Sequence, residues 1–298
     1  MASSPRLVAQ DFDPQVLILF DAYVHGDIDR RGFLRRAGEL LGSAAALGVL
    51  AALAPRFAAA QQVAADDPRL DARHVEFESP QGHGRGRGYL VRPAAAAGPL
   101  PLVLVVHENR GLNPHIEDVA RRLALRDYIA FAPDALFPLG GYPGDEDRAR
   151  ELFATLDQDR TRADFLAAEA FLRSVDGHNG RLGAVGFCYG GAMVNFLATR
   201  LPGLAAAAPF YGGPAPLDAV GNIRAELLVV LAGNDPRVNA AWPAYEQALQ
   251  QAGVSFTLLQ PPGTQHGFHN DTTPRYDEAA ARQAWTATLA LFERRLRG

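Results

Sequence analysis

The chain has 298 residues, 48% hydrophobic and 21% charged, which is typical of a soluble globular protein with a sizeable core. Its formal net charge is −4, so the chain has no excess of basic residues of the kind that nucleic-acid-binding proteins carry, and we expect no nucleic acid partner. The single cysteine, Cys188, excludes an internal disulfide and a cysteine-based metal centre, and is either a buried small residue or a nucleophile.

The first sixty residues predict an N-terminal extension (1–60). Residues 11–28 carry an amphipathic helical pattern whose apolar face would hold Val16, Leu17, Leu19, Phe20, Tyr23 and Val24. Residues 29–38, DRRGFLRRAG, resemble a twin-arginine export signal, with two adjacent arginines before a Phe-Leu pair and a basic residue. A mildly apolar segment and an A-x-A site at residues 58–60 follow, as in cleaved leaders.

These features predict a periplasmic or secreted protein, with the twin-arginine export machinery as a partner. The alternative is a cytoplasmic protein whose N-terminal helical hairpin stays attached. Because residues 37–54 are only weakly apolar and contain Glu39, we expect no permanent membrane span. Residues 61–72 are predicted to be a polar linker.

From residue 73 onward, strand patterns alternate with helix patterns. Residues 73–79 and 87–92 predict a hairpin around a turn-rich segment. Further strands are predicted at 101–108, 128–134, 181–187, 204–212, 225–235 and 254–260. Helices are predicted at 115–126, 146–157, 160–175, 190–200, 240–252 and 277–296. This alternation favours one α/β domain over residues 73–298, with a mainly parallel sheet between two layers of helices.

The sequence GFCYGG (186–191) places Cys188 between glycines at a predicted strand-to-helix turn. In a nucleophile elbow the turn is too tight for side chains at the flanking positions, here Gly186 and Gly190, and it lifts the central side chain out of the sheet. The following helix then presents backbone amides beneath the reacting atom. The alternatives are a dinucleotide-binding loop, which would need glycine at position 188, and a tight turn around a buried cysteine.

Polar residues that end other predicted strands complete a hydrolase site. The α/β-hydrolase order is nucleophile, acid, histidine, and Asp235 and His266 occupy the last two places. His266 would accept the thiol proton, and Asp235 would orient the ring. His269 is a candidate pocket residue, whereas His25 is a weaker candidate because it lies in the leader. No helical metal-ligand spacing is present, so we expect neither a metal nor a cofactor.

The segments GFCYGG, AGNDPRV, QHGF and HENRGL together resemble the dienelactone hydrolase (carboxymethylenebutenolidase) family over residues 73–296. The resemblance implies an α/β-hydrolase that cleaves a small ester or lactone through a thioester on Cys188. It implies that Glu108 restrains the thiol until substrate arrives. It also implies that the backbone amides of Asn109 and Tyr189 form the oxyanion hole.

The chain departs from the family after the catalytic histidine. Well-known members carry an arginine there that binds the substrate carboxylate, and this chain has Asn270, which cannot supply a charged fork. We therefore do not expect dienelactone itself to be the best substrate. The candidate substrate-binding residues are Arg110, His269 and Asn270, with Arg148 and Arg150 as further sources of positive charge.

Three alternatives stay open at this point. Glu108 could form a salt bridge with Arg110 instead of restraining the thiol. The chain could also be a general carboxylesterase, thioesterase or peptidase on the same scaffold, or a non-catalytic binding protein that retains the fold.

Overall fold

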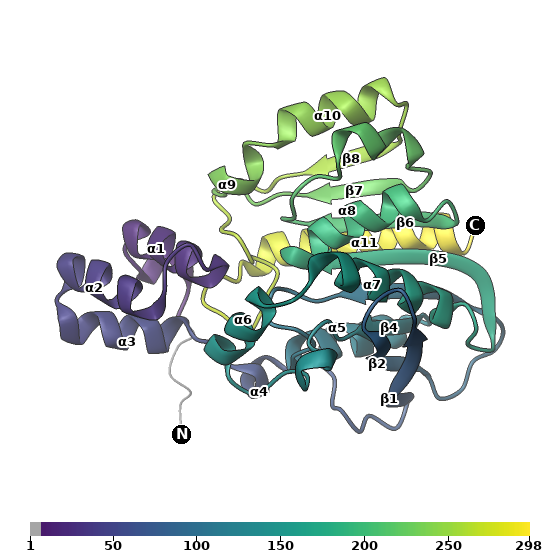
Figure 1. Cartoon of the computed structure of the whole chain (residues 1–298), viewed down its shortest axis with the longest axis horizontal. Helices are drawn as coiled ribbons and strands as arrows, with labels where there is room; N and C mark the ends of the chain where they lie inside the picture. The colour runs from purple at the N-terminus through teal and green to yellow at the C-terminus, as the bar shows by residue number, and fades with distance from the viewer. Residues whose placement is uncertain (1–6) are drawn as a thin grey trace.

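The computed structural model describes residues 7–298, so the first six residues of the predicted extension lie outside the described residues. A sheet of eight strands, in the order β1-β2-β4-β3-β5-β6-β7-β8, organises the chain from residue 70 onward (Figure 1). The strands are β1 (Leu70–Ser79), β2 (Gly84–Pro93), β3 (Leu100–Val106), β4 (Ile129–Pro133), β5 (His178–Phe187), β6 (Leu204–Phe210), β7 (Glu226–Val230) and β8 (Phe256–Leu259).

The pairing of these strands confirms the predicted hairpin and the mainly parallel sheet. β1 and β2 pair antiparallel, β2 also pairs antiparallel with β4, and the other neighbours run parallel. Every residue of β3 is buried, which explains its uninterrupted apolar sequence, because a central parallel strand has no face in water.

Helices cover both faces of the sheet. They are α5 (Pro114–Ala124), α6 (Glu146–Ala154), α7 (Gln158–Leu172), α8 (Tyr189–Arg200), α9 (Pro236–Asn239), α10 (Trp242–Gln251) and α11 (Glu278–Leu296). Buried side chains of α7, α8 and α10 pack in one core, and those of α5 and α11 pack in the core on the opposite face. The predicted α/β architecture is confirmed, and its loops at the carboxyl ends of the parallel strands position the site described below.

The segment predicted as a linker (61–72) is shorter and better anchored than expected. β1 already begins at Leu70. Val63 is buried, its N–H donates to Asp118 (2.8 Å), and its carbonyl accepts from Arg121 (3.0 Å). The buried side chain and these two hydrogen bonds together hold the segment on α5.

Residues 14–60 form four helices that we call the N-terminal cap: α1 (Pro14–His25), α2 (Arg30–Leu41), α3 (Ser43–Leu53) and α4 (Phe57–Ala60). In Figure 1, α1, α2 and α3 form a separate bundle beside α6. The predicted amphipathic helix in residues 11–28 is confirmed, since α1 buries Val16, Leu17, Phe20 and Tyr23. Among the described residues, no helix has the length and apolar character needed to cross a membrane.

Local sequence sets both ends of α1. Asp13 accepts a hydrogen bond from the Gln15 N–H (2.7 Å) and caps the start of the helix. Gly26 adopts a left-handed conformation (φ 88°), which ends the helix immediately after His25. His25 is therefore the last residue of α1, at the point where the cap meets the catalytic domain.

Candidate active site

Cys188 occupies a strained turn between β5 and α8. Its φ is 56°, in the left-handed region that a non-glycine residue rarely adopts. A Cβ atom on Gly186 would lie 2.2 Å from the carbonyl oxygen of Gly190, and a Cβ on Gly190 would lie 2.2 Å from that of Val106. Because backbone atoms stand at both places, the turn requires both glycines, as the elbow interpretation predicts.

Asp235 and His266 meet beside this turn. Asp235 follows β7 and caps α9, and His266 lies in the loop after β8. The His266 Nδ1 atom donates to the Asp235 carboxylate at 2.5 Å, and both residues are buried. A bridge between Asn234 and Gln265 joins the two loops, so backbone pairing holds Asp235 and His266 near each other.

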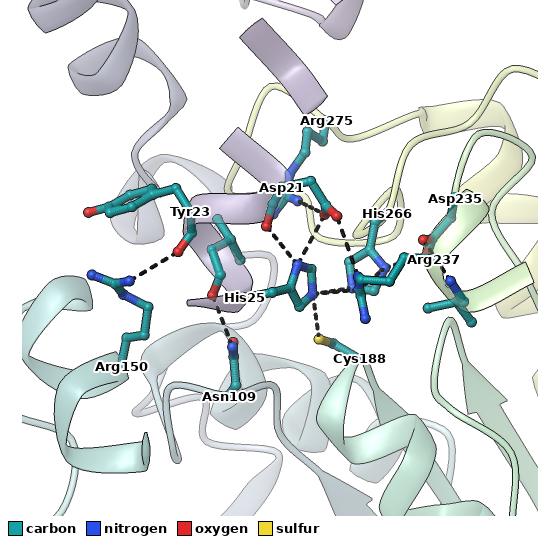
Figure 2. A network of polar contacts seen from close by, with 12 residues as sticks. Asp21, Tyr23, His25, Asn109, Arg150, Cys188, Asp235, Arg237, His266 and Arg275 are labelled. Carbon is teal, nitrogen blue, oxygen red and sulfur yellow. Dashed lines mark hydrogen bonds and ion pairs between the residues drawn. The ribbon is translucent and has the colours of Figure 1, made fainter. Parts of the chain in front are cut away.

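The hydrogen-bond partner of the thiol is a histidine from the cap. Cys188 Sγ lies 3.4 Å from His25 Nε2, which lies 3.2 Å from His266 Nε2 (Figure 2). His25 Nδ1 donates to the backbone carbonyl of Asp21 (2.7 Å) and lies 3.3 Å from the Asp21 carboxylate. Two histidines, each backed by an aspartate, therefore converge on one thiol. Sequence analysis ranked His25 low, because nothing in its local pattern connects it to the elbow.

The electrostatics of this group favour a thiolate. Burial raises the pKa of Cys188, but the positive charges of His266 and His25 outweigh burial and lower that pKa to about 5. Burial lowers the pKa of His25, but the thiolate and Asp21 outweigh it and raise that pKa to about 10. The pKa of His266 is raised in the same way, by the thiolate and by Asp235 against the effect of burial. At neutral pH the thiol proton therefore resides on the histidines.

The same atoms form a donor set that metals could use. Cys188 Sγ and the facing nitrogens of His25 and His266 lie within 4.8 Å of one another, and thiolate with imidazole is a zinc-type combination. However, Arg237 Nη2 lies 2.8 Å from His25 Nε2. The positive charge of this guanidinium beside the donor set opposes a bound cation, so the arrangement favours proton exchange over cation binding.

Glu108 and Asn270 lie together in the wall of the site. The Asn270 side-chain amide donates to the Glu108 carboxylate at 3.0 Å. Arg110, the alternative partner considered for Glu108, has its Nε atom 3.5 Å from the carboxylate of Glu146. Position 270 thus contributes a neutral hydrogen bond to Glu108 where the family's arginine would stand.

Of the two residues predicted to form the oxyanion hole, Tyr189 follows Cys188 directly and Asn109 lines the same pocket as Cys188. Tyr189 is the first residue of α8, where backbone N–H groups lack intrahelical partners and negative charge is favoured. Asn109 lies across the pocket, and its side chain donates to the backbone carbonyl of Val24 in the cap (3.0 Å; Figure 2). The cap therefore contacts the loop that would carry one of the two amides.

Three further candidates for substrate binding, His269, Arg148 and Arg150, are not in the lining of the pocket. His269 is buried with its ring stacked on Phe187 (5.1 Å between centroids), and burial lowers its pKa to about 3. The structure thus places His269 in the apolar core as a neutral residue, and does not bring it to the pocket. Arg148 is exposed on α6, and Arg150 stacks over the ring of Tyr23 at 4.6 Å.

A pocket of about 430 Å³ between the cap and the catalytic domain reaches Cys188 and His266. Its size is ordinary for a small-molecule site. The cap contributes an apolar wall that includes Phe20, Leu50, Leu53 and Phe57. The opposite wall is polar and includes Glu108, Asn109, Arg110, Asn270 and Arg275.

Arg275 is a pocket cation that sequence analysis missed. Its side chain is only 8% exposed, stacks over the Phe20 ring (5.2 Å) and lies 3.6 Å from the Asp21 carboxylate. Its Nε and Nη1 atoms make no hydrogen bond to any described residue. A Cβ atom at position 267 would lie 3.3 Å from Nη2 of Arg275, which is a tight contact. Because Gly267 has no side chain, the guanidinium can approach the backbone there. Arg275 lies beyond position 270, so the family motif gave no reason to single it out.

Comparisons with known proteins cover both parts of the chain. The sequence model described as "Dienelactone hydrolase family" matches residues 87–296, and one described as "YqhI-like" matches residues 4–42. A "Putative carboxymethylenebutenolidase" of Salmonella typhi is 33% identical over 221 residues, covering 68% of this chain and 81% of that protein. The "Putative hydrolase fragment YghX" of Escherichia coli K12 is 54% identical over 112 residues, covering 38% of this chain and 96% of the fragment.

Solved structures agree with the fold. A crystal structure described as a "Putative Dienelactone Hydrolase" from Klebsiella pneumoniae has a TM-score of 0.66 and 30% identity, and it covers 74% of this chain and 98% of that one. The acylaminoacyl peptidase of Pyrococcus horikoshii, at 19% identity and a TM-score of 0.60 over 76% of this chain and 42% of its own, shares the fold alone. The sheet and its helices therefore have the α/β-hydrolase architecture.

Proposed function

The chain belongs to the dienelactone hydrolase family and is a hydrolase of esters or lactones; we propose that it cleaves a small ester or lactone through a thioester on Cys188. The observation that carries this proposal is the position of the sulfur. It stands on the strained elbow in the lining of a pocket, with a ring nitrogen of His266 within 4.8 Å and Asp235 behind the His266 ring. A nucleophile, an ordered base and room for a substrate are the parts that acyl transfer requires.

In the proposed acylation, the Cys188 sulfur attacks the carbonyl carbon, and the carbonyl oxygen gains negative charge. The N–H groups of Tyr189 and Asn109 would stabilise that oxygen. The bond from carbon to the leaving oxygen then breaks, and His266 donates the proton that this oxygen needs. Asp235 supports the reaction because burial raises its pKa but the hydrogen bond and charge of His266 lower it further, so it stays anionic beside the ring.

Deacylation repeats these steps with water. His266 removes a proton from water, the hydroxide attacks the thioester carbon, and the sulfur leaves. The carboxylic acid is released, and Cys188 returns to its starting state. The restraining role that the resemblance implies for Glu108 needs a protonated thiol at rest, whereas His25 and His266 favour the thiolate here. We therefore propose that Glu108, which accepts a hydrogen bond from Asn270, shapes the polar wall of the pocket.

A substrate panel tests the function directly. We expect hydrolysis of lactones and small aryl or alkyl esters with an apolar group that suits the cap wall, and an acyl mass increment on Cys188 during turnover. Thioesters and short peptides complete the panel. Cleavage of peptides or thioesters with no turnover of oxygen esters would contradict the proposal, and no turnover of any member would favour a binding protein.

Arg275 is expected to bind a carboxylate of the substrate. Arg275→Gln should raise KM about tenfold for an ester that carries a carboxylate, because a charged hydrogen bond contributes about 1.5–3 kcal/mol. KM for the matched neutral ester should change less than about twofold. Arg148→Gln, at the exposed position on α6, is the matched control. An equal change for both esters would instead assign Arg275 a purely structural role.

We further propose that residues 29–38 direct export by the twin-arginine route, which transports folded proteins. Lysine at both Arg30 and Arg31 should retain the protein in the cytoplasm, and cell fractionation measures this. The intact mass of the exported protein then shows whether the chain is cut after Ala60. An unchanged distribution of the double variant would refute the signal.

A further inference from the structure

We infer that His25 of the N-terminal cap is a catalytic residue that carries the thiol proton between Cys188 and His266. The inference rests on the thioester chemistry proposed above, and it deepens that proposal because it makes the cap part of the active site. Removal of residues 1–60 would then remove a functional group together with the leader.

Hydrogen bonds determine which nitrogen of each histidine faces the thiol. The Nδ1 atom of His25 faces the carbonyl oxygen of Asp21 at 2.7 Å, and the Nδ1 atom of His266 faces the carboxylate of Asp235 at 2.5 Å. In the neutral rings these acceptors hold the proton on Nδ1, so both Nε2 atoms carry lone pairs. Two lone pairs 3.2 Å apart repel each other unless a proton lies between them, and the thiol supplies that proton.

The distances define a path for the proton. It leaves Cys188 Sγ for His25 Nε2 across 3.4 Å and then reaches His266 Nε2 across 3.2 Å. The same nitrogen of His25 receives the proton from the sulfur and passes it on to His266. Figure 2 shows the three side chains in this sequence, with His25 between the sulfur and the second ring.

Charge gives the path a direction. While the sulfur is a thiolate, its negative charge holds the proton on His25. Once the sulfur bonds to the acyl carbon, that attraction ends, and Arg237, 2.8 Å from His25 Nε2, opposes the remaining positive charge. His266 has the closer carboxylate behind it, since its Nδ1 atom lies 2.5 Å from Asp235 and the Nδ1 atom of His25 lies 3.3 Å from the Asp21 carboxylate. His266 therefore accepts the proton, which then goes to the leaving oxygen. In deacylation a proton from water returns through His266 to His25 while the sulfur leaves as a thiolate, so no proton is gained or lost over the cycle.

The cap holds His25 in place through contacts around the last turn of α1. The Asp21 carboxylate lies 3.6 Å from Arg275 and 3.7 Å from Arg237. The carbonyl of Val24 accepts from Arg110 (3.2 Å) as well as from Asn109.

Helix α6 also holds the last turn of α1. Arg150 donates to the carbonyl of Tyr23 at 3.1 Å. These contacts leave the pocket open to Cys188 and His266. The docked cap is therefore compatible with a bound substrate, and it does not have to leave for the reaction to occur.

The first test measures acylation in the full-length enzyme. His25→Ala should slow the pre-steady-state burst about 100-fold, the usual minimum for loss of a general acid or base, with KM changed less than about twofold. Added imidazole should restore part of the rate, which a purely structural role would not allow. Ile18→Ala, on the exposed side of the same helix (69% exposed), is the matched control and should behave as wild type. His25→Gln, which preserves side-chain volume, repeats the test if the alanine variant unfolds.

The second test does not depend on the substrate. Alkylation of Cys188 by iodoacetamide reports the thiolate, which should be present in the wild type above about pH 5. In His25→Ala the alkylation profile should shift to higher pH. Wild-type-like alkylation together with equal or faster hydrolysis would overturn the inference, and faster hydrolysis would identify His25 as an obstruction. His25-dependent alkylation in a protein that hydrolyses no ester would refute the proposed function but support the role of His25 in proton transfer.

Discussion

Replacement of Cys188 by alanine is expected to lower kcat for the best ester or lactone by about 10⁶-fold, which leaves only background hydrolysis. The sulfur forms the covalent intermediate, and no other nucleophile stands on the elbow, so no residue of the triad can compensate. Initial rates with the best substrate of the panel measure this loss. The fold should persist, because alanine removes one atom from a side chain that is 9% exposed.

The control for this experiment is Cys188→Ser, which keeps a nucleophile of similar size. Serine should retain measurable turnover only if His25 and His266 can deprotonate a hydroxyl, whose pKa is far above that of a thiol. Ester hydrolysis that survives in Cys188→Ala at more than about one per cent of the wild-type rate would exclude the thioester mechanism. Thermal unfolding of each variant separates chemistry from stability.

Asp235→Asn should lower kcat by about 10⁴-fold, the cost of replacing the triad carboxylate where its role has been measured in other enzymes. The amide keeps the shape of the side chain but can donate its own hydrogen to His266 Nδ1. The ring would then carry its proton on Nε2, and it would face His25 and the thiol as a donor instead of an acceptor. The protonated ring would also lose the opposing charge now 2.5 Å away.

Asp218→Asn is the matched control for this substitution, because Asp218 is exposed in the short surface segment Leu217–Asn222. Full activity of Asp235→Asn would show that another carboxylate orients His266. Partial activity, about 100-fold below wild type, would indicate that the Asp21–His25 pair sustains proton transfer by itself.

Much of the catalytic core was predictable because its causes are local. Two glycines on either side of a cysteine, between an apolar strand and a helix, describe a turn that only those residues allow. The positions of Asp235 and His266 follow from the order of strands and helices, since parallel strands bring their carboxyl ends to one edge. The reach of Glu108 into the same pocket was predictable for the same reason.

His25 and Arg275 were not predictable from their neighbours in sequence. The pattern around His25 is that of an export leader, and its function depends on the docking of α1 against loops that follow distant strands. Arg275 reaches the pocket because Gly267 leaves space beside the backbone and because Phe20 of the cap offers a ring for the guanidinium to stack on. His269 shows the opposite error: three positions from His266, it turns into the core because aromatic rings surround it there.

The groups that make the thiol reactive are spread across the chain, with 163 positions between His25 and Cys188 and 241 between His25 and His266. The ribosome synthesises His25 first and His266 last. Until the C-terminal part has folded, Cys188 lacks the second histidine charge that lowers its pKa, and most of it stays a protonated thiol. At neutral pH a nascent or misfolded chain therefore carries a smaller fraction of thiolate than the folded protein. Near neutral pH, the rate of alkylation of Cys188 would therefore report whether the active site has assembled. The measurement applies to nascent chains and to protein recovered after transport.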